Sequence, residues 1–104
     1  MLGSEYQARA MEYKHGDDDL LNALLGMCGE AGECADMYKK HVFQGHEFKT
    51  DEFLLEVGDV LWYVACACEA MGASLDEVMQ RNLDKLAKRY PDGYSNEASI
   101  NRTL

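Results

Sequence analysis

Residues 53–71 read FLLEVGDVLWYVACACEAM and are apolar almost all the way round a helix. The one proline of the chain, Pro91, lies well outside this stretch, so nothing in it forbids a long helix. A helix that is apolar on nearly every side has to be covered on several sides. The three other helices of the same subunit can hardly do that. We therefore expect subunits to pair through their long central helices.

Two further helices are expected before this stretch. The first spans roughly residues 5–14, with Ser4 and Gln7 as a capping box at its start and Gly16 at its end. The second covers about 17–41, with acidic residues at its beginning and basic residues at its end. Both charge placements suit the dipole of a helix in that position.

The helix that contains the quoted stretch begins at about residue 50 and ends before Gly72. A capping box that starts with Ser74 begins the last helix, and Pro91 ends it. No structure is assigned to the polar tail at 92–104. The 104 residues thus predict a single all-α domain, a four-helix bundle-like subunit that assembles into a homodimer or homotetramer.

The composition limits the partners. The chain carries 10 basic and 19 acidic residues, a net charge of −9, which opposes binding to duplex nucleic acid. The longest apolar run is far shorter than the ~20 residues that span a bilayer, and no signal peptide is visible, so we expect a cytoplasmic protein without membrane contact. Four cysteines match no zinc pattern and are interpreted as small buried apolar side chains. They are Cys28, Cys34, Cys66 and Cys68.

Two pairs of carboxylates interrupt the apolar helices. Glu30 and Glu33 lie in the second helix, and Glu56 and Asp59 lie in the third. Residues three apart share a helix face, with Cβ atoms ~5–6 Å apart. Burying such like charges is unfavourable unless a cation compensates them. Two pairs on facing helices would form an oxygen-only site, for which Mg²⁺ is the first choice and Mn²⁺ an alternative.

Each pair taken alone is compatible with a solvated stripe or a half-buried salt bridge to lysine, so the metal hypothesis depends on both pairs together. Gly26 and Gly29 fall on the carboxylate side of their helix and leave room for either a ligand or a close helix crossing. A di-iron carboxylate site would need two Glu-x-x-His motifs, and the chain has one, from Glu12 to His15.

These segments resemble a known family. Residues 29–36, GEAGECAD, resemble the E-x-x-E segment of MazG-like nucleoside triphosphate pyrophosphohydrolases, and residues 56–63, EVGDVLWY, resemble their E-x-x-D segment. Residues 82–93, NLDKLAKRYPDG, resemble the segment that typically follows. The resemblance covers roughly residues 20–94 in the right order. Gly29 is a departure, because many members carry an extra glutamate there.

The resemblance implies Mg²⁺-dependent hydrolysis of nucleoside triphosphates between the α- and β-phosphates, which gives a monophosphate and pyrophosphate. It implies that Glu30, Glu33, Glu56 and Asp59 hold the metal. Glu33, together with Glu30, is assigned the catalytic role of orienting or deprotonating the attacking water. The implied task is housekeeping of the nucleotide pool.

Further side chains are candidates for substrate binding. Tyr63 shares the carboxylate face of the third helix and could hydrogen-bond a phosphate or the sugar. Lys40 falls nearer the carboxylate face of its helix than its neighbour does. On the fourth helix, one edge of the apolar stripe offers hydrogen-bond donors and positive charge for phosphates. This edge consists of Asn82, Lys85 and Arg89. Each of these residues would also be unremarkable as an ordinary core or surface residue.

Other functions stay open on the sequence alone. Phosphoribosyl-ATP pyrophosphohydrolase belongs to the same superfamily, and the carboxylate pairs do not distinguish its substrate from other triphosphates. A non-catalytic helical oligomer would bind Mg²⁺ and nucleotide but release no pyrophosphate. A purely structural bundle would show no Mg²⁺-dependent rise in melting temperature, because only binding to the native state produces one.

Overall fold

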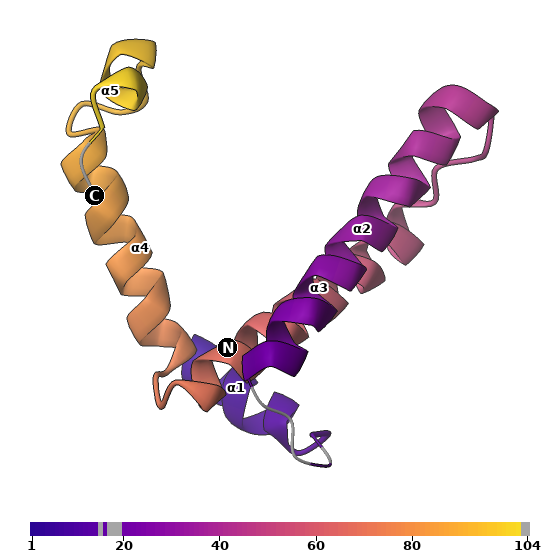
Figure 1. Cartoon of the computed structure of the whole chain (residues 1–104), viewed down its shortest axis with the longest axis horizontal. Coiled ribbons are helices and arrows are strands. Elements are labelled where there is room, and N and C mark those ends of the chain that lie inside the picture. The colour runs from indigo at the N-terminus through magenta and orange to yellow at the C-terminus, as the bar shows by residue number, and fades with distance from the viewer. Residues whose placement is uncertain (15, 17–19, 103–104) are drawn as a thin grey trace.

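The computed structural model describes residues 1–14, 16 and 20–102, and this part of the chain contains five helices and no strand. The helices are α1 (Gly3–Met11), α2 (Leu20–Gln44), α3 (Thr50–Ala70), α4 (Leu75–Arg89) and α5 (Asn96–Ile100). The predicted all-α class is confirmed. Figure 1 shows an open V, in which α2 and α3 run side by side in one arm, α4 and α5 form the other, and α1 lies near the vertex.

A short turn folds α3 back along α2. Gly45 begins it with a φ of 71°, a left-handed conformation that favours glycine. Phe48 then packs between the two helices, with ring centroids 5.7 Å from Tyr38 of α2 and 5.1 Å from Phe53 of α3. The ring nitrogen Nδ1 of His41 lies 2.8 Å from the carbonyl oxygen of His46. This closed end fixes the register in which α2 and α3 face each other.

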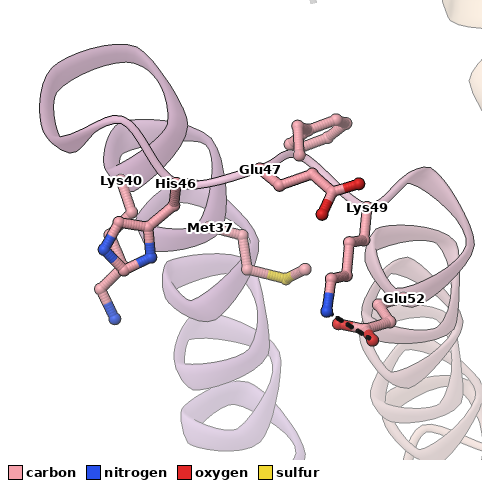
Figure 2. Close-up of a pocket in the computed structure, with 7 residues that line it drawn as sticks. Met37, Lys40, His46, Glu47, Lys49 and Glu52 are labelled. Carbon is pink, nitrogen blue, oxygen red and sulfur yellow. Dashed lines mark ion pairs between the residues drawn. The ribbon is translucent and has the colours of Figure 1, made fainter.

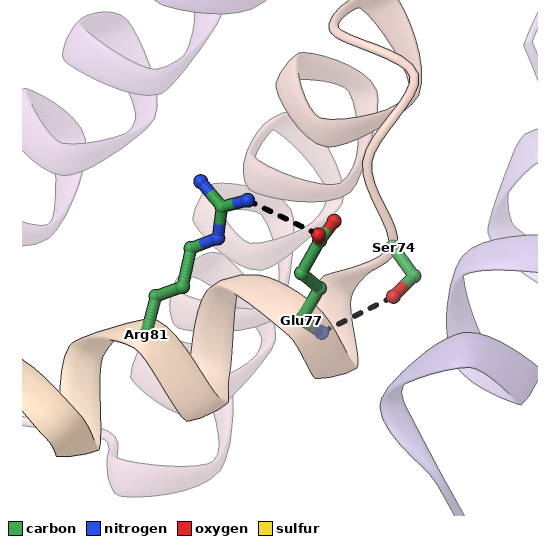
Figure 3. Close-up of polar contacts among 3 residues, drawn as sticks. All are labelled: Ser74, Glu77 and Arg81. Atoms are coloured by element: carbon green, nitrogen blue, oxygen red, sulfur yellow. Dashed lines mark hydrogen bonds and ion pairs between the residues drawn. The ribbon is translucent and has the colours of Figure 1, made fainter.

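The vertex begins where α3 ends. Gly72 has a φ of 67°, and it allows the chain to turn sharply into α4. Ser74 Oγ accepts a hydrogen bond of 3.1 Å from the backbone N–H of Glu77, and Arg81 pairs with the Glu77 carboxylate at 3.2 Å (Figure 3). The glycine stop and the Ser74 cap predicted from the sequence are therefore confirmed.

The predicted capping box of Ser4 and Gln7 is wrong. The backbone N–H groups of Ser4 and of the preceding glycine instead donate to the Asp76 carboxylate of α4, at 3.0 and 2.9 Å. The Gln7 side chain is buried, donates to Glu69 at 2.9 Å and accepts from the backbone N–H of Leu75. The Asp76 carboxylate of α4 thus takes the place of the predicted cap within α1, because α1 packs against the vertex.

The helix limits differ from the predicted ones at several ends. The first helix covers Gly3–Met11 instead of 5–14, and α2 continues to Gln44. The tail, to which no structure was assigned, contains α5, whose N-terminus is capped by Ser95 Oγ. The acidic residues 17–19, predicted to open α2, lie outside the described residues, as does His15 of the Glu-x-x-His motif.

The core of a single chain is small. The buried apolar residues among those described are Ala10, Ala23, Ala65, Cys66, Cys68 and Leu75. Leu54 and Leu55 of α3 are 57% and 73% exposed, so the face of α3 that turns away from α2 lacks a cover within the chain. The prediction that all four cysteines are buried is wrong for Cys28, which is exposed, and for Cys34, which is half-buried. None of the described helices is both long and apolar enough to cross a lipid bilayer.

Candidate metal centre

Three carboxylates meet between α2 and α3. Glu30 and Glu33 of α2 and Glu56 of α3 each offer one oxygen, and these oxygens all lie within 4.8 Å of one another. The three-residue spacing places the two glutamates of α2 on one face, and the hairpin turns that face toward α3. The sequence prediction that carboxylates of both helices converge therefore holds for these three residues.

The surroundings of the three groups fit a cation. The Oε2 atoms of Glu30 and Glu56 are buried and have no hydrogen-bond partner among the described residues. Burial, followed by the adjacent carboxylates of Glu33 and Glu30, raises the pKa of Glu56 to about 7. Buried carboxylate oxygens without a donor are unfavourable, and an oxygen-only donor set matches a hard divalent ion.

Asp59 lies at the edge of this cluster. Its side chain is exposed and is not one of the three groups within 4.8 Å, but its negative charge contributes to the raised pKa of Glu56. The negative charge of Asp59 also helps to raise the pKa of the Cys34 thiol. Burial raises the pKa of that thiol most, and the charges of all four predicted metal ligands raise it further. These are Glu56, Glu30, Glu33 and Asp59. The four carboxylates therefore surround one region of the hairpin.

The two glycines on α2 have different roles. A Cβ atom at Gly26 would lie 2.2 to 2.5 Å from ring carbons of Tyr63, so Gly26 serves close packing of α3 on α2. Gly29 has nothing within 4 Å of the corresponding position and leaves the surface open beside Glu30. Trp62 donates a hydrogen bond of 3.0 Å to the carbonyl oxygen of Ala10 and packs edge-on against Tyr63. Tyr63 thus lies one turn from the carboxylates, against α2.

A cavity of about 390 Å³ lies at the closed end of the hairpin (Figure 2). Lys40 lines it from α2 and pairs with Asp36 at 2.8 Å. Lys49 lines it from the start of α3 and pairs more loosely, at 3.8 Å, with Glu52. The other lining residues are Met37, His46, Glu47 and Phe48.

The cavity lies nearer the closed end of the hairpin than the carboxylates do. Lys40 follows Glu33 by seven residues and Lys49 precedes Glu56 by seven, which corresponds to about 10 Å along each helix. Sequence reasoning named Lys40 but missed Lys49. Helical spacing could not have found it, because Lys49 lies in extended backbone just before α3 begins.

The substrate-binding candidates on α4 lie elsewhere in a single chain. Asn82 and Lys85 are exposed on the second arm of the V, which runs away from the hairpin (Figure 1). Arg89 is half-buried near the far end of that arm, with its guanidinium carbon 5.9 Å from the Tyr90 ring centroid. Its Nε is buried without a hydrogen-bond partner among the described residues. One copy of the chain does not bring these three side chains to the carboxylates.

The site is thus an all-α hairpin with three carboxylates between its helices, an arrangement that could hold a divalent cation. The comparisons place the chain more narrowly. A family model for the MazG nucleotide pyrophosphohydrolase domain matches residues 19–94, and the chain belongs to that family. It is also similar to the Gene 37 protein of Mycobacterium phage L5, with 37% identity over 95 residues, which are 84% of this chain and 83% of that protein. No solved structure matches it.

The family membership confirms the resemblance found in the sequence. It indicates a nucleotide pyrophosphohydrolase, and enzymes of this family generally use divalent metals, in agreement with the carboxylate cluster. The name of the phage protein states no activity.

Proposed function

We propose that the protein hydrolyses ribo- or deoxyribonucleoside triphosphates between the α- and β-phosphates and releases a monophosphate and pyrophosphate. The observation that carries the proposal is the meeting of Glu30, Glu33 and Glu56 within 4.8 Å, together with the family membership. With Asp59 these residues would hold Mg²⁺, or Mn²⁺ in its place. The ion would supply positive charge to the phosphate oxygens as negative charge develops on them.

Glu33 is the catalytic carboxylate in this proposal, and Glu30 assists it. Glu33 is exposed, whereas Glu30 and Glu56 are half-buried, so Glu33 is the most accessible to a water molecule. A carboxylate that is not fully engaged can orient such a water or take its proton as it attacks the α-phosphorus. Asp59, which is also exposed, completes the negative charge on the α3 side of the cluster.

Lys40 and Tyr63 complete the substrate site on the hairpin. Lys40 already shares Asp36 with Lys39, at 2.8 and 3.4 Å, and can exchange that partner for a phosphate oxygen. Tyr63, four residues after Asp59, packs against Gly26, and its hydroxyl would hydrogen-bond the sugar or a phosphate. In the proposed arrangement the reacting phosphate would lie at the carboxylates, and the released pyrophosphate would lie toward the cavity beside Lys40.

The activity is part of the housekeeping of the nucleotide pool, and the active form is a homodimer or homotetramer. Leu24 and Leu25 of α2, 46% and 63% exposed, and Leu55 of α3, 73% exposed, support assembly through the two long helices. Apolar side chains exposed to this extent on adjacent helices are typical of surfaces that a second subunit covers.

The test is pyrophosphate release from a panel of ribo- and deoxyribonucleoside triphosphates and phosphoribosyl-ATP, with Mg²⁺ and with a chelator. Mg²⁺-dependent release of pyrophosphate and the matching monophosphate from the panel is the expected result. Release from phosphoribosyl-ATP alone would assign the alternative reaction. Binding of Mg²⁺ and nucleotide without any release would replace the enzyme with a non-catalytic helical oligomer.

Two carboxylate variants test the metal site. Glu33→Gln and Asp59→Asn should lose Mg²⁺-dependent turnover by roughly a hundredfold or more and keep their helical circular dichroism. Asp51→Asn is the matched control, because it removes the same charge from an exposed position two turns before Asp59. Full activity in both active-site variants would refute the assignment.

Lys40 has its own matched control. Lys40→Ala should raise KM for triphosphates roughly tenfold, because one charge-assisted phosphate contact is lost. Lys39→Ala removes an ammonium that pairs with the same Asp36 but does not line the cavity, and it should leave KM unchanged. Equal effects of the two variants would show that Lys40 acts only through the charge of α2.

A further inference from the structure

Aromatic side chains of α1 and of the turn that follows it form a pocket with α3. The pocket has a volume of about 340 Å³. It is lined by three aromatic rings and two charged side chains, which belong to Tyr6, Tyr13, Trp62, Arg9 and Glu12. Aromatic walls with a small number of polar groups are typical of sites that bind a small planar ligand.

The indole ring of Trp62 is held in one orientation. Its Nε1 donates a hydrogen bond of 3.0 Å to the carbonyl oxygen of Ala10, and the ring packs edge-on against Tyr63 with the centroids 5.1 Å apart. Tyr63 in turn fits closely against Gly26 of α2. This wall of the pocket is therefore preorganised, which lowers the entropic cost of stacking a ligand against it.

The pocket is a neighbour of the carboxylate centre. Trp62 follows Asp59 by three residues, so the two side chains share a face of α3. Burial raises the pKa of the Tyr6 phenol most, and the Cys66 thiol and the Asp59 carboxylate raise it further. Tyr6 thus lines the pocket and lies within reach of the charge of Asp59. A ligand that extends from the carboxylates past Asp59 would reach the aromatic walls.

The two charged side chains of the pocket are available to such a ligand. Arg9 and Glu12 are exposed, and neither forms an ion pair with a described residue. They lie three residues apart and therefore side by side. A guanidinium only donates hydrogen bonds and a carboxylate only accepts them. A planar ligand with acceptors next to donors on its edge would satisfy both groups.

We propose that this pocket binds the nucleobase of the substrate and favours guanine. Tyr13 and Trp62 stack on the base, while Arg9 and Glu12 bind its edge. The O6 and N7 atoms of guanine accept from a guanidinium, and its N1–H and amino group donate to a carboxylate. The inference rests on the proposed function, because the base belongs to the nucleotide whose phosphates lie at the carboxylates.

Fluorescence tests the pocket without turnover. Trp62 is the one tryptophan of the chain, so the intrinsic emission reports on this wall. The α,β-methylene analogue of GTP, which cannot release pyrophosphate, should quench the emission in the presence of Mg²⁺. Inorganic tripolyphosphate, which has the phosphates without a base, should not, and N-acetyltryptophanamide corrects for absorption by the base. Equal effects of the two ligands, or no quenching by the analogue, would overturn the proposal.

The exposed ring of Tyr13 provides a matched pair of variants. Tyr13 is 77% exposed, so its replacement should leave the helical circular dichroism unchanged. Tyr13→Ala should weaken binding of the analogue roughly tenfold because one stacking ring is lost, whereas Tyr13→Phe keeps the ring and should bind like the wild type. Wild-type affinity in Tyr13→Ala would overturn the stacking role.

Base selection is measured as the ratio of kcat/KM for dGTP to kcat/KM for dCTP. Arg9→Met and Glu12→Gln should each lower this ratio roughly tenfold, since each removes a contact that guanine makes bidentately. Glu5→Gln removes the same charge as Glu12→Gln from a position of α1 outside the pocket, and it should leave the ratio unchanged. A ratio that neither pocket substitution changes would overturn the assignment.

These outcomes separate the base pocket from the reaction. Quenching by the analogue but not by tripolyphosphate, in a protein that hydrolyses no triphosphate, would support the base pocket and remove only the reaction. Hydrolysis of triphosphates without any quenching by the analogue would keep the reaction and overturn the pocket.

Discussion

Lowering the pH from 8 to 6 should weaken Mg²⁺ binding roughly tenfold, because one proton competes with the ion. Burial, followed by the adjacent carboxylates, raises the pKa of Glu56 to about 7, so Glu56 holds a proton below that pH when no metal is bound. Mg²⁺ requires the carboxylate and displaces the proton. The apparent dissociation constant is then multiplied by about 11 at pH 6 and by about 1.1 at pH 8, for a single competing proton.

The stability of the metal-free protein should show the opposite slope. A carboxyl group whose pKa is raised by folding stabilises the folded state fully below the ordinary value of 4.5, and this contribution is lost as the pH rises through about 7. The melting temperature in chelator should therefore fall across this range. Saturating Mg²⁺ should reduce the fall, because bound metal removes the repulsion that makes Glu56 hold its proton.

Titration calorimetry at several pH values, with thermal melts in parallel, measures both effects. Glu33→Gln should move the pH dependence to lower pH, because Glu33 is one of the carboxylates that raise the pKa of Glu56. Asp51→Asn, which removes a charge outside the cluster, should leave it unchanged. An affinity for Mg²⁺ that varies less than about twofold between pH 6 and pH 8 would refute the geometry of the cluster.

Further predictions concern helix packing in the hairpin and a buried hydrogen bond at the vertex. Gly26→Ala should destabilise the protein by about 1 kcal/mol, because overlap with the Tyr63 ring outweighs the better helix propensity of alanine, whereas Gly58→Ala, with open space at its Cβ, should stabilise it by up to about 1 kcal/mol. Gln7→Leu should cost about 2–4 kcal/mol, since it leaves the backbone N–H of Leu75 without its acceptor. Urea denaturation measures both, and a stabilised Gly26→Ala would contradict the close packing.

Regular spacing explains which parts of the fold could be predicted from the sequence. The apolar run 53–71 and the stop at Gly72 gave the limits of α3 almost to the residue, since both signals are local. The carboxylate cluster was likewise predictable, because two three-residue spacings in adjacent helices, once folded into a hairpin, leave few other arrangements. Glu30 and Glu56 therefore meet as expected.

The contacts that could not be predicted join residues far apart in the chain. Asp76 caps a helix that begins 73 residues earlier, at Gly3, and Gln7 satisfies the backbone of Leu75 across 68 residues. No local pattern distinguishes Asp76 from any other acidic residue in the first turn of a helix. The direction of α4 could not be predicted either, since an apolar stripe indicates that a helix is covered but not which surface covers it.

The carboxylates of the hairpin are held close together by packing between the cluster and the vertex. Tyr63 fits against Gly26, one turn before Glu30, so α3 cannot slide along α2. Trp62, one turn beyond Asp59, is tied to the backbone of α1 by its hydrogen bond to Ala10. With the helices fixed in this way, mutual repulsion of the carboxylates cannot be relieved by moving them apart. It is relieved by uptake of a proton or a cation, and near neutral pH, where Glu56 titrates, a divalent ion has the advantage of neutralising more than one group.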